Sequence, residues 1–517
     1  MIKKGFRIFQ LRQEQPGISN RSVGRALDLP ASTVDYQVNL QARRNQYPES
    51  QFWESEEGQY FLKILVLGVL YFFSIKSGVG AGRVKEFFKA LRLYTHIGIS
   101  ESSILRKIKE VELLILKYKE LREKDLLDSA AYKEGLNLIL GLDETWLDNM
   151  LLVCQELTSG YLFCEQVSEK RDAPSWWKVL SSNMGAFWAQ SQVRLLVSDR
   201  AKALIKLGKP GYLNAFSMPD LFHFMQDIAR SVGSKLRLKL TNIGKQLSKA
   251  RLTEQEKEAL QEKYEQLEEW LSLYTTYRQG MNQLVHPFDE QGKLLSLSAI
   301  EIGLNRLYTK IRAVAQEAGI TISIAQCSKV INQIPDIAKG VFTWQTWLQE
   351  ELKSLLLAPI TAKWLLEIVL PYAYWQLHLA KISTRKRDKL LRQDCKNRAT
   401  QSQQRLEQFN TDDLPITQQQ KELYVNWAFQ MAATFHRSSS QVEGRNGYLA
   451  FMHNAHRGIP EQRQQALTVV HNFDIRRADD KTPAERLFKM DFPDLFDFIV
   501  QNVTDFASPR KGAKARA

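Results

Sequence analysis

Two apolar stretches of the sequence each run into an aspartate. Residues 136–142 read LNLILGL and precede Asp143, and residues 193–198 read VRLLVS and precede Asp199. If both stretches form parallel neighbouring strands, the two aspartates emerge at the same edge of a sheet, where ligands gather in open α/β folds. Carboxylate oxygens are the hard ligands that magnesium prefers. The pair therefore predicts a site for divalent cations.

A third carboxylate, Glu443, lies much later in the chain, in the segment SSSQVEGRNGYLAFMHNAHRG at residues 438–458. One interpretation is a capping box, in which Ser440 caps a helix and Glu443 reaches back to it. The other is a metal ligand, and the two roles are compatible. Asn446 and Gly447 share a helical face with Glu443, and Arg445 offers donors suited to phosphate.

Three carboxylates of this kind suit a two-metal reaction. Two magnesium ions about 3.5–4 Å apart would activate the attacking oxygen and stabilise the leaving one in a phosphoryl displacement. Manganese is expected to be able to replace magnesium. No G-x-x-x-x-G-K-[ST] phosphate loop is visible, so any fuel-driven step would need a partner.

The elements around these acids follow a recognisable order. Three β-rich runs from residue 136, a helix from Pro174 and the strand before Asp199 predict the order β-β-β-α-β. The stretch 231–436 reads as helical throughout, with a capped start at Thr253. Its tryptophans, Trp344, Trp347, Trp364 and Trp375, could stack on an unpaired base, although core packing is the more common role.

The N-terminal residues 17–44 predict a helix-turn-helix. Ser19 can cap a first helix with Val23, Ala26 and Leu27 inward, and Ser32 a second helix after the break at DLP. An ordinary helical hairpin is the alternative. As groove and phosphate contacts we expect Arg21, Arg25, Ser32, Thr33, Tyr36, Gln37, Arg43 and Arg44.

A second helical pair follows, with one helix over residues 83–91 and another over residues 102–114. Arg106 and Lys107 are expected to be exposed on the second helix and to contact DNA. A plain helical linker is the competing interpretation.

Composition sets the frame for these motifs. A chain of 517 residues is too long to fold around a single hydrophobic core. Its net charge of +14 favours a polyanionic partner. The four cysteines show no zinc spacing and read as reduced core thiols. The apolar run from Tyr60 to Ile75 is shorter than a bilayer span requires and reads as a buried helix. We therefore expect a cytoplasmic protein that is associated with the nucleoid and has no membrane partner.

With Asp143, Asp199 and Glu443, the chain resembles the DDE transposases of the RNase H-like superfamily, and most nearly prokaryotic insertion-sequence transposases with a VEGRNG motif. In the segment PDLFHFMQDIAR, Asp220 and His223 are similar to the C/D-x-x-H element of hAT-like and Mutator-like transposases. Asp220, His223, Arg445 and Asn446 are thus auxiliary site candidates. The likeness covers most of the chain.

The resemblance implies an α/β RNase H-like core interrupted by a large all-α insertion, in a chain that is mostly helical. It also implies metal-dependent hydrolysis at terminal inverted repeats of double-stranded DNA, followed by attack of the freed 3′-hydroxyl on target DNA. Synapsis of two ends implies a homodimer or larger assembly.

The expected domains are a helix-turn-helix (1–50), a second DNA-binding region (51–130), two parts of the catalytic core (131–230 and 437–505), the insertion (231–436) and a basic tail (506–517). Two rival functions remain open. One is a domesticated DNA-binding regulator that has lost cleavage, and the other is a structure-specific RNase H-like nuclease.

Overall fold

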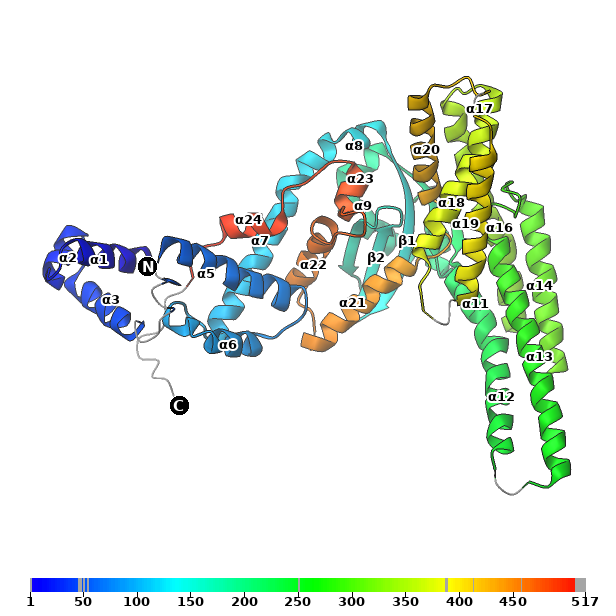
Figure 1. The fold of residues 1–517 in the computed structure, drawn as a ribbon, viewed down its shortest axis with the longest axis horizontal. Helices are drawn as coiled ribbons and strands as arrows, with labels where there is room; N and C mark the ends of the chain where they lie inside the picture. The colour runs from blue at the N-terminus through cyan, green and yellow to red at the C-terminus, as the bar shows by residue number, and fades with distance from the viewer. Residues whose placement is uncertain are drawn as a thin grey trace. The chain divides into compact units, whose positions relative to one another are not determined.

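The computed structural model describes residues 2–44, 49, 52–53, 55–249, 252–385, 389–411, 413–456 and 458–506 (Figure 1). Contacts within the chain divide it into two compact units. We call residues 131–446 the sheet unit, and residues 1–130 with 447–517 the terminal unit. The predicted basic tail, apart from Phe506, lies outside the described residues.

The sheet unit is built on one five-stranded mixed sheet in the order β3-β2-β1-β4-β5. β1 pairs antiparallel with β2 and parallel with β4; β2 pairs antiparallel with β3, and β4 parallel with β5. The strands are β1 (Leu136–Trp146), β2 (Met150–Glu156), β3 (Leu162–Val167), β4 (Ser191–Ser198) and β5 (Phe216–Pro219). The predicted order of three strands, a helix and a fourth strand is confirmed, and β5 extends it.

Short helices connect the strands of this sheet. Asp172 caps the helix between β3 and β4, where its side chain accepts a hydrogen bond from the Ser175 amide, as N-cap aspartates do. The connecting elements are α9 (Ala173–Met184), η3 (Gly185–Gln190) and α10 (Lys202–Leu207), whereas α8 (Ala130–Glu134) precedes β1 and α11 (Leu221–Ile228) follows β5. These connections bring the C-terminal ends of β4 and β5 to the same edge, because both strands run parallel to β1.

A long helical segment follows α11 and lasts until α21. It contains η4 (Ala229–Gly233), α12 (Ser234–Leu247), α13 (Glu254–Leu284), α14 (Leu297–Glu317), α15 (Ile324–Ile331), α16 (Ile334–Ser354), α17 (Pro359–Trp364), η5 (Leu365–Val369), α18 (Leu370–Lys381), α19 (Lys389–Gln408), α20 (Gln418–Ala433) and α21 (Ser440–His456). Thr253 and Glu256 form a capping box at the start of α13, which confirms the predicted cap. α13 packs between α12 and α14 (Figure 1).

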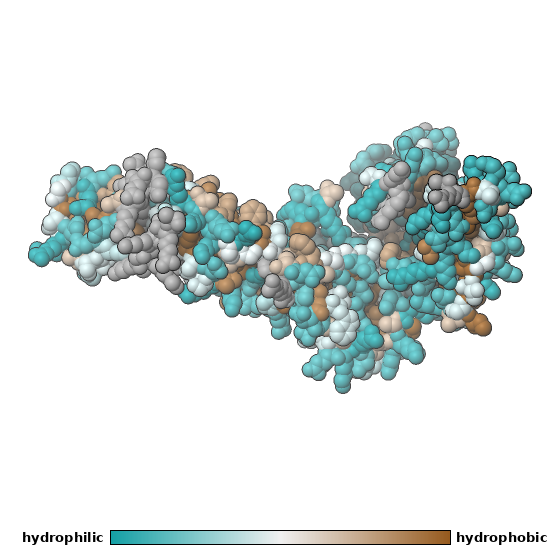
Figure 2. Space-filling view, turned by 90° about the horizontal axis from the view of Figure 1, so that it is seen from below, coloured by the Kyte–Doolittle hydropathy of each residue, from teal (hydrophilic) through white to brown (hydrophobic). Residues whose placement is uncertain are grey.

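The helical segment has its own apolar core. All four tryptophans named above are buried, with Trp364 only 1% exposed. These four side chains fill the core, so none of them presents a ring face on which a base could stack. Hydrophilic residues predominate on the face of these helices seen in Figure 2.

The terminal unit begins with three small helices, α1 (Ile2–Glu14), α2 (Asn20–Ala26) and α3 (Ala31–Arg44). Ile8, Val23 and Val34, one from each helix, form their shared core. Ser19 caps α2 as predicted, its side chain accepting from the Ser22 amide. The second predicted cap is wrong, because α3 begins at Ala31, directly after Pro30, and so contains Ser32. Proline has no amide to satisfy, which suits the edge of a helix.

The turn between α2 and α3 depends on a glycine. A Cβ on Gly24 would lie 2.6 Å from the carbonyl oxygen of Leu29, so only glycine permits this close approach. The Leu29 amide in turn donates to the Gly24 carbonyl at 2.8 Å. α2 and α3 are therefore joined by a tight turn, and the prediction of a helix-turn-helix that binds DNA stays a prediction.

The rest of the terminal unit packs around one long helix, α7 (Glu101–Asp128), which is twice as long as predicted and contacts α6, α22 and α24. The remaining elements are α5 (Glu56–Gly68), η1 (Val69–Ile75), α6 (Ala81–Ala90), η2 (Leu93–Thr95), α22 (Glu461–Phe473), α23 (Pro483–Phe488) and α24 (Leu495–Asn502). The segment Glu56–Ile75 is long and apolar enough to cross a membrane by length and composition, and 50% of its most apolar window is buried in the protein.

Candidate active site

Asp143 lies within β1, whereas the sequence analysis had placed it just beyond the end of a strand. The strand continues to Trp146 because residues 143–146 pair with β2, with Asp143 opposite Val153. The Asp143 carboxylate is half-buried, and its Oδ1 accepts the Glu144 amide at 2.9 Å. The aspartate is thus held on a rigid strand beside the C-terminal end of β4.

The late helix α21 packs directly on β1. A Cβ on Gly141 would lie 2.9 Å from Cγ2 of Val442 and 2.6 Å from Cδ2 of Leu157, so the missing side chain leaves the space that Val442 fills. Gln441 Nε2 also donates to the Leu157 carbonyl at 2.7 Å. These contacts fix the start of α21 over β1 and so determine where Glu443 lies.

A hydrogen bond ties α21 to the strand aspartate. Asn446 Nδ2 donates to Asp143 Oδ2 at 2.7 Å, although the two residues are 303 positions apart in the chain. Glu443 lies one helical turn before Asn446, and its Oε1 is 3.2 Å from Nε2 of His223 on α11. These contacts link Asp143 to Asn446 and Glu443 to His223 across β1, α21 and α11.

Asp199 follows the last residue of β4, as predicted, and is exposed. Its Oδ1 accepts the Ala201 amide at 2.9 Å. The next residue, Arg200, has a positive φ of 72°, and its guanidinium donates to the Ser217 carbonyl at 3.0 Å. The turn after β4 is thereby held against β5.

The three carboxylates influence one another electrostatically. The pKa of Asp143 is raised to about 7, chiefly because the group is buried, and further because Glu443 and Asp199 add negative charge nearby. The Glu144 amide and His223 act in the opposite direction. Perturbed acids of this kind cluster at functional sites, where burial and like charges are brought together.

The donor set can be tested against the divalent cations expected from the sequence. Three carboxylates with only oxygen donors match the preference of magnesium and manganese, and the mutual repulsion that they suffer is what a cation would relieve. However, among the described residues no three His, Cys, Asp or Glu side chains are grouped closely enough to hold a metal ion. Each carboxylate instead bonds a neighbouring protein group. The oxygen donors of the three carboxylates therefore fit these cations. Binding of a cation would require the three side chains to turn towards one another.

Arg445 does not face the carboxylate cluster. Its Nε and Nη2 donate to the two carboxylate oxygens of Glu165 on β3 at 2.6 and 2.8 Å, and both side chains are buried. The expectation that Arg445 offers donors to phosphate is therefore not supported by its position. It holds α21 against β3, and the signal in the sequence was an acidic residue, Glu165, in a strand of mostly apolar residues.

Asp220 has a similar tethering position. It is buried at the start of α11, where its Oδ1 accepts the Phe222 amide as an N-cap. Its other oxygen accepts the amide of Ser439 at 2.9 Å and bonds the Ser439 hydroxyl. Ser439 precedes α21, and its carbonyl, not a Ser440 side chain, accepts the amides of Val442 and Glu443. Asp220 therefore joins the helices that carry His223 and Glu443.

The candidate DNA contacts on α2 and α3 differ in their exposure to solvent. Arg21, Arg25 and Ser32 are exposed, and Thr33 and Tyr36 are half-buried. The side chains of Arg43 and Arg44 lie outside the described part of the chain.

The prediction that Gln37 contacts DNA is not supported by its position. It is only 6% exposed, because it lies one turn after the core residue Val34 and packs towards α1, close to Gly5. It is buried between helices and not presented to a groove.

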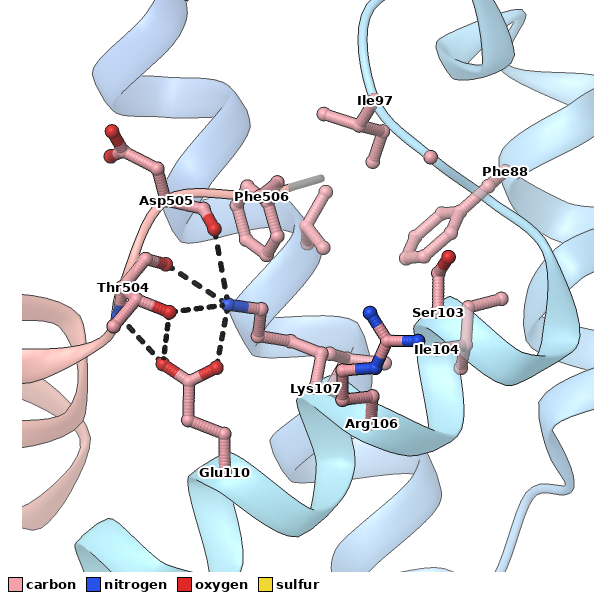
Figure 3. Close-up of a pocket in the computed structure, with 13 residues that line it drawn as sticks. Phe88, Ile97, Ser103, Ile104, Arg106, Lys107, Glu110, Thr504, Asp505 and Phe506 are labelled. Carbon is pink, nitrogen blue, oxygen red and sulfur yellow. Dashed lines mark hydrogen bonds and ion pairs between the residues drawn. The ribbon is translucent and has the colours of Figure 1, made fainter. Parts of the chain in front are cut away.

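The prediction that Lys107 is exposed is wrong, because the residue is buried. It shares the buried face of α7 with Ile104 and Val111, and its ammonium group is bound within the terminal unit. Nζ is 2.7 Å from Glu110 Oε2 and donates to the carbonyls of Thr504 and Asp505 at 3.0 and 3.3 Å (Figure 3). Arg106 beside it is exposed, as predicted.

Comparison with known proteins finds a family match for the C-terminal part of the chain. Residues 365–515 match a family of unknown function, DUF6399. The matched segment includes Glu443, Arg445 and Asn446 but neither Asp143 nor Asp199. No curated protein matches the chain.

Proposed function

We propose that this protein is a DNA transposase of the DDE type, with an RNase H-like core. It would bind the terminal inverted repeats of a mobile element, cut them by hydrolysis and transfer the new 3′-hydroxyl to target DNA. The observation that carries this proposal is the convergence of Asp143 and Glu443, through Asn446 and Gly141, at the end of β4 where Asp199 lies.

The chain's own residues have distinct roles in this proposal. Asp143, Asp199 and Glu443 would hold two magnesium ions, or manganese ions, which supply the Lewis acidity for phosphoryl transfer. His223 holds the Glu443 carboxylate, and Asn446 orients that of Asp143. Arg445 and Asp220 are positioning residues, because they anchor α21 through Glu165 and Ser439.

Double-stranded DNA is the proposed partner, and the net charge of +14 together with exposed Arg21 and Arg25 supports it. Pairing of two element ends would need a homodimer or larger assembly. The proposed location is the cytoplasm, on the nucleoid.

A plasmid assay tests the catalytic proposal. The substrate is a supercoiled plasmid that carries the coding region with its native flanking DNA, incubated with the protein and magnesium. We expect nicked and strand-transfer products from the wild type, and a loss of at least about 100-fold for Asp143→Asn, since each metal ligand is essential to the two-metal geometry. Asp413→Asn, an exposed carboxylate between α19 and α20, is the matched control and should retain full activity.

The outcomes also separate the rival functions. A DNA-binding regulator is favoured by one observation, namely that the described carboxylates are not grouped as metal ligands. Equal products from the wild type and Asp143→Asn would support the regulator and overturn the enzyme. Nicking of junctions or RNA hybrids without strand transfer would identify a structure-specific nuclease instead.

A further inference from the structure

A cavity of about 400 Å³ lies in the sheet unit, between α11, α12, α13, the start of α19 and the segment before α21. Three arginines line it: Arg237 from α12, Arg278 from α13 and Arg437 from the segment before α21. No acidic residue is among the described residues that line it. We refer to this cavity as the arginine pocket.

Among the residues that the structure describes, no acidic side chain pairs with the arginines of the pocket. Within the described ranges, none of the three arginines takes part in an ion pair, and Arg437 Nη1 donates only to the carbonyl of Asn282, at 2.9 Å. The Nε atom of Arg278 is buried without a hydrogen-bond partner. An unpaired donor of this kind is costly, and an anion bound at the arginines would offset that cost.

Apolar residues form about half of the remaining wall, and Tyr274, Thr275, Gln279, Asn282 and Ser438 form the rest. Leu221, Met225, Leu390 and Leu391 line the pocket beside Phe222, whose ring is 49% exposed. Arginines that converge beside leucines and an exposed aromatic ring suit a ligand with a phosphate at one end and a flat apolar body at the other. A nucleotide has this composition, and aromatic rings stack on bases without sequence preference.

The pocket adjoins the carboxylate cluster along the chain. Arg437 and Ser438 lead directly into α21, which carries Glu443, and Phe222 precedes His223, which contacts Glu443. We propose that the arginine pocket binds one nucleotide of an unpaired DNA strand, with its phosphate on the arginines and its base against Phe222, next to the strand that is cut. The assignment to DNA depends on the proposed function, whereas the affinity for a phosphate ester does not.

Binding measurements on the full-length protein test this proposal. Fluorescence anisotropy compares a blunt duplex with the same duplex bearing a short single-stranded overhang, in EDTA so that no cleavage occurs. We expect Arg278→Gln to weaken binding of the overhang duplex about tenfold, since one charged hydrogen-bond donor is lost, and to leave the blunt duplex unchanged. Arg306→Gln, at an exposed arginine on α14 outside the pocket, should change neither.

Two further arms decide the remaining alternatives. Arg237→Gln alters an exposed side chain, so it should preserve the fold and still weaken overhang binding even if Arg278→Gln fails to fold. dAMP and inorganic phosphate should compete more weakly than the oligonucleotide. Equal competition by dAMP would assign the pocket to a free nucleotide and overturn the strand proposal. Overhang binding unchanged in both variants would overturn it altogether. Because no step requires catalysis, an inactive enzyme would leave this result intact.

Discussion

At the scale of single residues, Gly141 determines how closely α21 approaches the sheet. Gly141→Ala places a methyl group within 2.9 Å of Val442 and 2.6 Å of Leu157. Overpacking of this kind costs roughly 1–3 kcal/mol, and any outward shift of α21 moves Glu443 away from Asp143. We expect a lower midpoint of urea unfolding together with a larger fractional loss of plasmid nicking.

A second glycine on the same helix is the matched control. A Cβ on Gly444 meets nothing within 4 Å, so Gly444→Ala should stabilise α21 by roughly 0.5–1 kcal/mol. Urea midpoints that do not differ between the two variants would contradict the close packing of α21 on β1.

At the scale of elements, the ion pair between α21 and β3 holds the helix in register. Arg445→Ala leaves the buried Glu165 carboxylate without its main partner, and removing one member of a buried pair typically costs about 3–5 kcal/mol. The unfolding midpoint in urea should fall accordingly. The double variant Arg445→Met with Glu165→Leu should recover most of the loss, because apolar replacement of both members is often neutral.

Arg306→Ala serves as the control for loss of an exposed arginine and should shift the midpoint by no more than about 0.5 kcal/mol. If Arg445→Ala behaved in the same way, the clamp between α21 and β3 would not contribute to stability.

The sequence predicted the strands of the sheet well, because apolar runs are local signals. Asp143, Asp199, Glu443, His223 and Asn446 were proposed as site residues from short polar motifs, and their joint role stays a prediction. The roles of Arg445 and Gln37 were not predictable, because each depends on a partner from a distant element, Glu165 on β3 and α1 respectively. The prediction that Lys107 is exposed was wrong, because its side chain starts on an apolar face of α7. Its ammonium group binds Thr504, which is distant in the sequence.

At the scale of the whole molecule, the helical segment should be sensitive to mild acid. The pKa values of His286 and His378 lie below 6.5, mainly because both are buried and also because Arg437 is nearby. The two histidines are therefore harder to protonate in the folded chain than in the unfolded chain. Stability is highest above about pH 6.5 and falls below it, by up to about 1.4 kcal/mol per pH unit for each histidine.

Thermal unfolding of wild type and His378→Leu between pH 8 and pH 5 measures this effect, and the variant should lose less stability on acidification. The comparison removes the opposite contribution of Asp143, whose raised pKa of about 7 favours the folded state as the pH falls below 7. Identical pH slopes for the two proteins would exclude His378 as a source of acid sensitivity.

The separation of Asn446 from Asp143 by 303 positions also has a consequence for biosynthesis. All five strands are synthesised long before α21. Until α21 is made, Gly141 is not covered by Val442 and Glu165 lacks its partner Arg445. Every product of premature termination in the helical segment lacks the last carboxylate. Under the proposed function, no such truncated product would be able to cut DNA, because each of them lacks Glu443.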